Sequence, residues 1–145
     1  MTEQTVLPAV TMPPRALVVE DDGEECEVLA GFLRLAGFDV DTARDGAAAL
    51  DYLCAHVHQD RPDVMLLDMD LPRCTGAKIV HTVRGEPAYA KLKIIAVTGD
   101  EPEEFDLDSV VAQIDRWFRK PLDPECLVRE MNQQLIVLPE PESNC

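Results

Sequence analysis

The sequence lacks any excess of basic residues, and this absence excludes several classes of function. It holds 28 Asp and Glu residues against 13 Lys and Arg, which gives a formal net charge of −15. A chain this acidic is repelled by the phosphates of nucleic acids and by anionic membranes, so we expect no direct nucleic-acid binding. A basic protein surface or a metal ion is the natural counterpart of such a charge.

Long hydrophobic runs and patterned cysteines are missing as well. No apolar run approaches the roughly 20 residues that span a bilayer, and the N-terminus lacks the basic start and apolar stretch of a secretory signal. The five cysteines show neither the spacing of a zinc site nor that of a disulfide framework. We therefore expect a cytoplasmic protein with free thiols and no membrane insertion.

Four apolar segments are present, and each is followed at once by residues that can handle a metal or a phosphoryl group. These are Glu20 and Asp21 after residues 16–19, Asp68 after 64–67, Thr98 after 94–97, and Lys120 after the shorter 117–119. Continuous aliphatic runs of this length are typical of strands buried on both faces. Because ligands bind outside the carboxyl ends of the strands in an open parallel sheet, we expect these side chains to share one pocket.

Helical patterns alternate with the strands. We expect helices after Asp22, Asp45 and Gly76, a fourth helix over residues 105–114 and a last one around 127–135, with a further short strand at 38–42. Five such βα repeats predict an α/β fold with a parallel sheet and helices on both faces. We expect residues 1–14 to form a flexible leader, 15–135 the domain and 136–145 a flexible tail.

The predicted pocket suits phosphoryl chemistry. Clustered carboxylates either retain a proton or bind a divalent cation, and Mg²⁺ prefers oxygen ligands such as those of Glu20, Asp21 and Asp68. A carboxylate can also attack a phosphoryl group to give an acyl phosphate. Thr98 could then donate to one phosphoryl oxygen, while Lys120 neutralises another.

Four motifs in this order resemble those of one protein family. They are Val18-Val19-Glu20-Asp21, the run Leu67-Asp68-Met69-Asp70-Leu71-Pro72 with Gly76, the pair Val97-Thr98, and the pair Lys120-Pro121. Over about residues 15–135 the chain resembles a response-regulator receiver domain, the aspartyl-phosphorylated module of two-component signalling. The resemblance implies a doubly wound (βα)5, flavodoxin-like sheet of five parallel strands in the order 2-1-3-4-5.

The resemblance also implies a phosphoacceptor and a metal site. Asp68 would accept the phosphoryl group, and Mg²⁺, or Mn²⁺ in its place, would bind directly to Asp21 and Asp68. Glu20 would act through a water molecule, and the backbone carbonyl of Asp70 would complete the protein ligands. The Asp70 side chain adds negative charge near the pocket mouth.

The remaining implied roles concern signalling. Thr98 and Lys120 would bind the phosphoryl group, and Thr98 with the aromatic residue Trp117 would form the switch. The partners would be a histidine kinase or phosphotransfer protein and a downstream target, which we expect to dock near the acidic stretch 100–108. The chain would catalyse only its own phosphorylation and dephosphorylation.

Other interpretations remain open at this point. Asp68, Asp70, Thr98 and Lys120 also resemble the motifs of haloacid-dehalogenase-type phosphohydrolases, although an acidic strand end comes before Asp68 here. A flavodoxin-like cofactor binder would place a phosphate against the acidic loop after residue 19. Within the receiver family, we expect a stand-alone protein, with a phosphorelay intermediate or a fragment of a larger regulator or hybrid kinase as alternatives.

Overall fold

Five parallel strands form a single sheet at the centre of the molecule. The computed structural model describes residues 13–99 and 111–135. The strands are β1 (Arg15–Val19), β2 (Asp39–Ala43), β3 (Val64–Asp68), β4 (Lys93–Thr98) and β5 (Arg116–Arg119). Their order in the sheet is β2-β1-β3-β4-β5, and every adjacent pair is parallel. The predicted flavodoxin-like α/β fold is therefore confirmed.

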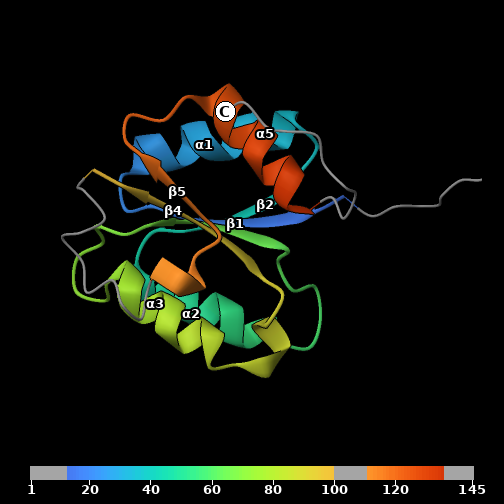
Figure 1. Cartoon of the computed structure of the whole chain (residues 1–145), viewed down its shortest axis with the longest axis vertical. Helices are drawn as coiled ribbons and strands as arrows, with labels where there is room; N and C mark the ends of the chain where they lie inside the picture. The colour runs from blue at the N-terminus through green and yellow to red at the C-terminus, as the bar shows by residue number, and fades with distance from the viewer. Residues whose placement is uncertain (1–12, 100–110, 136–145) are drawn as a thin grey trace, which may run out of the picture.

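Helices cover both faces of this sheet. The helix α1 (Gly23–Leu35) and the helix α5 (Pro124–Leu135) lie on one face, and α2 (Gly46–Ala55) and α3 (Gly76–Arg84) lie on the other (Figure 1). In the part of the chain that the structure describes, the short 3-10 helices η1 (Pro87–Tyr89) and η3 (Val111–Gln113) precede β4 and β5 respectively. Because all five strands are parallel, their carboxyl ends lie at the same edge of the sheet.

Side-chain caps fix where the helices begin. The Asp45 carboxylate accepts a hydrogen bond from the Ala48 N–H at 2.7 Å and so starts α2. Asp22 accepts from the Glu25 N–H at 3.0 Å and starts α1, as expected for a residue that satisfies an otherwise unpaired helix donor. The reciprocal half of a capping box is not formed, because the Asp22 N–H donates to Glu20 Oε2 at 3.1 Å.

The sheet separates two hydrophobic cores, because successive side chains of a strand point to opposite faces. The α1/α5 core contains Val18, Leu66 and Ile95 from the strands and packs against buried residues of α1 and α5. The α2/α3 core contains Leu17, Leu67 and Ile94 with buried residues of α2, α3 and η1. The strand that carries the predicted phosphoacceptor, β3, is buried along its whole length.

Not every apolar residue of helix α1 faces the core. Val28 and Phe32 have helical spacing, but they are 54% and 41% exposed. Its buried side chains are Cys26, Leu29, Ala30 and Leu33. The small Cys26 and Ala30 let the helix approach the sheet, and the larger Val28 and Phe32 are left on the outer side.

Some predictions concern residues outside the described ranges. The leader over residues 1–12, the tail over 136–145 and the acidic stretch 100–108 all lie there, as does most of the fourth helix expected over 105–114. The last part of that helix prediction was wrong, because Ile114 follows the 3-10 turn η3 and is buried in the link to β5. Among residues 13–99 and 111–135, no helix is long and apolar enough to cross a membrane.

Candidate phosphoacceptor and metal site

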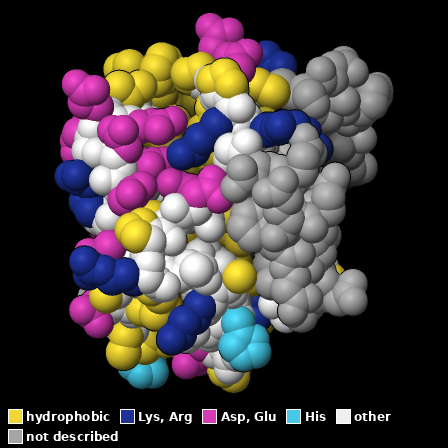
Figure 2. All heavy atoms as spheres, turned by 90° about the vertical axis from the view of Figure 1, so that its left-hand side faces the viewer, with side chains coloured by type: hydrophobic (Ala, Val, Ile, Leu, Met, Phe, Trp, Pro, Cys, Tyr) yellow, Lys and Arg dark blue, Asp and Glu magenta, His cyan; other side chains and the backbone are white. Residues whose placement is uncertain are grey.

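The side chains predicted from the strand ends lie together at the carboxyl edge of the sheet. Glu20, Asp68 and Thr98 are each 2% exposed, and they come from the ends of β1, β3 and β4. The Lys120 ammonium, just after β5, lies 3.4 Å from Asp68 Oδ2 and 3.5 Å from Glu20 Oε1. On this edge of the molecule, acidic side chains gather beside basic ones (Figure 2).

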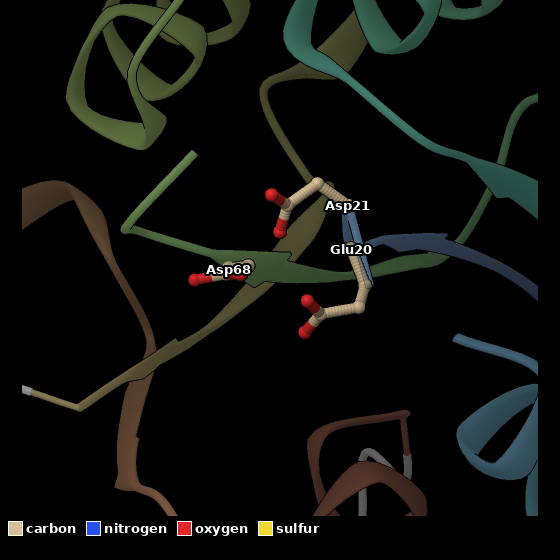
Figure 3. Close-up of side chains that lie close together, drawn as sticks. All are labelled: Glu20, Asp21 and Asp68. Carbon is tan, nitrogen blue, oxygen red and sulfur yellow. The ribbon is translucent and has the colours of Figure 1, made fainter. Parts of the chain in front are cut away.

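Three carboxylates form the acidic part of the site. One oxygen from each of Glu20, Asp21 and Asp68 can be chosen so that all three lie within 4.8 Å of one another. Glu20 and Asp21 turn to opposite sides of the end of β1, and Asp68 lies beside them at the end of β3 (Figure 3). Oxygen donors at this spacing fit a small hard cation such as Mg²⁺, which commonly takes one or two carboxylates and several waters.

The electrostatics of the site also favour a cation. The pKa of Glu20 is raised from 4.5 to about 7, chiefly by burial and also by the neighbouring Asp68 carboxylate, although the Asp22 N–H and Lys120 oppose the shift. A cation bound beside Glu20 would favour its ionised form and lower this pKa. The raised pKa is therefore consistent with a cation site, although burial is its main cause.

Lys120 remains an ammonium group in this setting. Burial acts to lower its pKa, but the carboxylates of Asp68, Glu20 and Glu25 outweigh burial and raise the pKa. Glu25 was not predicted as part of the site, and its Oε1 lies 3.8 Å from Lys120 Nζ. The sequence feature that could have indicated this contact is the position of Glu25 in the first turn of the helix that follows the acidic end of β1.

The Asp70 side chain makes hydrogen bonds in the site, whereas the resemblance implied a ligand role for its backbone carbonyl and only added negative charge from its side chain. Its carboxylate accepts a hydrogen bond from the Gly99 N–H at 2.9 Å, and the Thr98 hydroxyl donates to the same carboxylate at 3.3 and 3.4 Å. The Asp70 N–H donates to Asp68 Oδ1 at 2.8 Å. Asp70 therefore connects the ends of β3 and β4.

Trp117 lies on the sheet face that also carries Thr98. In the pairing of β4 with β5, Trp117 is opposite Ala96 and Arg119 is opposite Thr98. Trp117 is partly buried against the α2/α3 core, to which Ala96 belongs. By strand alternation, the side chains of Thr98, Ala96 and Trp117 are on the same face.

Two backbone features stand out in the segments around the site. A Cβ atom at Gly76 would come within 2.7 Å of Met69 Sδ and 2.8 Å of Met69 Cα, so only glycine lets α3 begin this close to the end of β3. The Lys120–Pro121 peptide bond is cis.

Comparison with known proteins decides the family. The family model described as the response regulator receiver domain matches residues 16–132. The chain belongs to this receiver family. Receivers are signalling domains rather than conventional enzymes, and family members bind Mg²⁺ at an acidic site. Membership favours this interpretation over a phosphohydrolase or a flavodoxin-like cofactor binder.

Individual relatives share about a third of the aligned residues. Protein Rrf1 of Nitratidesulfovibrio vulgaris is 30% identical over 124 residues, which cover 86% of this chain and 84% of Rrf1. The DNA-binding response regulator MtrA of Mycobacterium tuberculosis is 33% identical over 125 residues, covering 86% of this chain and 52% of MtrA. This receiver therefore spans about half the length of MtrA.

Solved structures agree with the observed fold. The chemotaxis response regulator CheY4 of Vibrio cholerae is 29% identical, with a TM-score of 0.73 over 86% of this chain and 100% of CheY4. The response regulator TrrA of Thermotoga maritima, solved in complex with Mg²⁺ and BeF, is 24% identical with a TM-score of 0.72. That match covers 84% of this chain and 99% of TrrA, and at this identity it supports the fold alone.

Proposed function

We propose that this receiver accepts a phosphoryl group on Asp68 from a histidine kinase or a phosphotransfer protein, in a reaction that requires Mg²⁺. The observation that carries the proposal is the surroundings of Asp68. It is buried at the end of the central strand, its Oδ2 lies 3.4 Å from Lys120 Nζ, and its carboxylate lies beside those of Glu20 and Asp21. The carboxylate proposed as nucleophile, the acids proposed to hold the cation and an ammonium group thus lie together, which supports the proposal.

The chemistry is a phosphoryl exchange between two protein side chains. An Asp68 carboxylate oxygen attacks the phosphorus of a phosphohistidine, an O–P bond forms, and the P–N bond breaks as the imidazole nitrogen leaves with the bond's electron pair. Dephosphorylation is attack by water on the same phosphorus, which releases phosphate and restores the carboxylate. Lys120 is placed to neutralise charge on the transferring group, since positioning and neutralisation are the main contributions in such reactions.

Asp21, Asp68 and, through water, Glu20 would hold the metal, together with the backbone carbonyl of Asp70. When bound, Mg²⁺ supplies positive charge that neutralises both these carboxylates and the phosphoryl oxygens. Mn²⁺ has a similar preference for oxygen ligands and would serve in the same place.

The signal would then pass to a downstream protein. The support for this step is the shared sheet face of Thr98 and Trp117, because a hydroxyl drawn toward a phosphoryl oxygen alters the space beside β5. We propose a stand-alone receiver in the cytoplasm, with a phosphorelay intermediate or a part of a larger regulator as the alternatives.

The test is labelling with a small phosphodonor. Incubation of the chain with acetyl phosphate and Mg²⁺ should add one acid-labile phosphoryl group, measured by mass spectrometry of the intact protein. Asp68→Asn should abolish the label, and the matched control Asp51→Asn, on the exposed side of α2, should keep it. Label retained in Asp68→Asn would contradict the proposal.

A second measurement separates the receiver from a phosphohydrolase. The receiver should not turn over an added phosphate ester such as p-nitrophenyl phosphate, because its acyl phosphate forms and decays once per donor encounter. Sustained multiple turnover that depends on Asp68 would favour the phosphohydrolase instead.

A further inference from the structure

The Asp70 carboxylate is a long-range acceptor for the Thr98 hydroxyl, the group proposed above to bind a phosphoryl oxygen on Asp68. Its Oδ2 accepts the Gly99 N–H at 2.9 Å, and the Thr98 hydroxyl lies 3.3 Å from Oδ2 and 3.4 Å from Oδ1. We propose that Asp70 is a positioning residue that holds the Thr98 hydroxyl away from Asp68, and that phosphorylation must break the contact between Thr98 and Asp70. We name these contacts of the Asp70 carboxylate with Thr98 and Gly99 the Asp70 latch.

The competition follows from donor chemistry. A threonine hydroxyl carries a single hydrogen, so it donates one strong hydrogen bond at a time. An ionised carboxylate and a phosphoryl oxygen are both strong, charged acceptors for that hydrogen. Thr98 is buried whereas Asp70 is exposed, so one acceptor of this buried hydroxyl lies on a solvent-exposed side chain.

The Gly99 amide anchors the latch. At 2.9 Å it makes the shorter contact with Asp70, and the two Thr98 contacts share the carboxylate at longer distances. The latch can therefore release Thr98 while Asp70 stays bound to Gly99. A built-in acceptor of this kind sets a threshold, because a weak phosphoryl mimic must compete with it.

The latch is also tied directly to the phosphoacceptor. The Asp70 N–H donates to Asp68 Oδ1 at 2.8 Å. A new bond on the Asp68 carboxylate therefore disturbs the segment that carries Asp70, as well as offering Thr98 a different acceptor. This inference rests on the proposed phosphorylation of Asp68 for its consequence, but the latch itself can be tested without it.

The first test examines the latch in the unphosphorylated protein. The Gly99 residue is exposed, and its amide should still be protected from hydrogen exchange because it donates to Asp70. In Asp70→Ala this protection, measured by NMR, should be lost, while the buried amides of β3 keep theirs as a control for folding. An unprotected Gly99 amide in the wild-type protein would overturn the inference.

The second test measures competition with beryllofluoride and Mg²⁺ as the phosphoryl mimic. Asp70→Asn keeps the shape of the side chain and removes its charge, so we expect binding to tighten by about fivefold, the difference between a charge-assisted and a neutral hydrogen bond. In a Thr98→Val background most of this gain should disappear, because the contested hydroxyl is gone. Asp22→Asn, which removes a charge from the neighbouring exposed helix cap, should have a smaller effect.

Two results of the second test would overturn the latch. The first is an equal gain from Asp70→Asn in the wild-type and in the Thr98→Val background, which would mean simple charge repulsion. The second is no gain in either background. Failure of the proposed function would look different, since the label from acetyl phosphate would then survive in Asp68→Asn whatever residue occupies position 70.

Discussion

Glu20 should make the metal-free receiver less stable as the pH rises. Its pKa is raised from 4.5 to about 7 in the folded protein, first by burial and then by the carboxylate of Asp68. The folded state therefore keeps a proton that the unfolded chain loses on going from pH 4.5 to pH 7. The free energy of unfolding falls over this interval and stays low above pH 7, because the stabilising proton is then lost from the folded state as well.

The size of the effect follows from the same two values. Each pH unit between 4.5 and about 7 corresponds to about 1.4 kcal/mol, so the loss approaches about 3 kcal/mol at alkaline pH. The total free energy of unfolding of a small domain is typically about 5–15 kcal/mol. Ionisation of this one carboxyl group is thus expected to remove a large part of the free energy of unfolding in the absence of metal.

Glu20→Gln tests this reasoning with little change of shape. The glutamine oxygen can still accept the Asp22 N–H, which lies 3.1 Å from Glu20 Oε2, and Lys120 keeps Asp68 and Glu25 as partners. At pH 8 without metal the variant should be more stable than the wild-type protein by up to about 3 kcal/mol. Near pH 4.5 the two proteins should be alike, because the native Glu20 is then protonated.

Urea unfolding at pH 4.5 and pH 8 in the presence of a chelator gives both free energies. The control is Glu24→Gln, which removes an exposed charge near the start of α1 and should change little at either pH. Millimolar Mg²⁺ should raise the stability of the wild-type protein at pH 8 and reduce its difference from Glu20→Gln, since a ligand of the folded state stabilises it. A variant less stable than wild type at pH 8, or a difference independent of pH, would refute the reasoning.

Further predictions concern the metal and the packing around the site. Trp117 is the only tryptophan in the sequence and lies on the strand beside β4, so the tryptophan emission should change when Mg²⁺ binds at the site. Asp21→Ala should abolish this change, and a variant that responds like the wild-type protein would place the metal ligands elsewhere. Gly76→Ala should lower the free energy of unfolding by about 1–3 kcal/mol, because its Cβ would collide with Met69. Gly31→Ala is the matched control inside α1, with nothing within 4 Å of the added atom, and should instead stabilise by about 0.5–1 kcal/mol, as measured by urea unfolding. Equal effects of the two glycine substitutions would contradict the close approach of α3 to β3.

The fold and the meeting of the predicted side chains could be read from the sequence for one physical reason. Strands buried on both faces give continuous apolar runs, and a parallel sheet aligns their carboxyl ends. Glu20, Asp68, Thr98 and Lys120 directly follow or end such runs, so local patterns were enough to place them at the same edge. Their chemical roles stay predictions until the labelling experiment is done.

The parts that were missed depend on side-chain directions that no local pattern encodes. The Asp70 carboxylate turns to β4 because of the path of the loop after β3, and Glu25 reaches Lys120 from the first helix of the chain. Nothing in the local sequence predicts that Glu130 is buried. In the structure it is buried, and its Oε2 accepts a hydrogen bond from Gln134 Nε2 at 2.9 Å. The directions of these side chains are set by how the helices and loops pack against the sheet.

The two cores lie behind different parts of the proposed mechanism. Glu20, Asp68 and Lys120 continue the strand positions that face the α1/α5 core, whereas Thr98 and Trp117 continue those that face the α2/α3 core. Among the described residues the two clusters have no member in common, so substitutions confined to one core should have effects on stability that add to those in the other. If the proposed roles hold, changes in one core would act mainly on phosphoryl chemistry and changes in the other mainly on the switch.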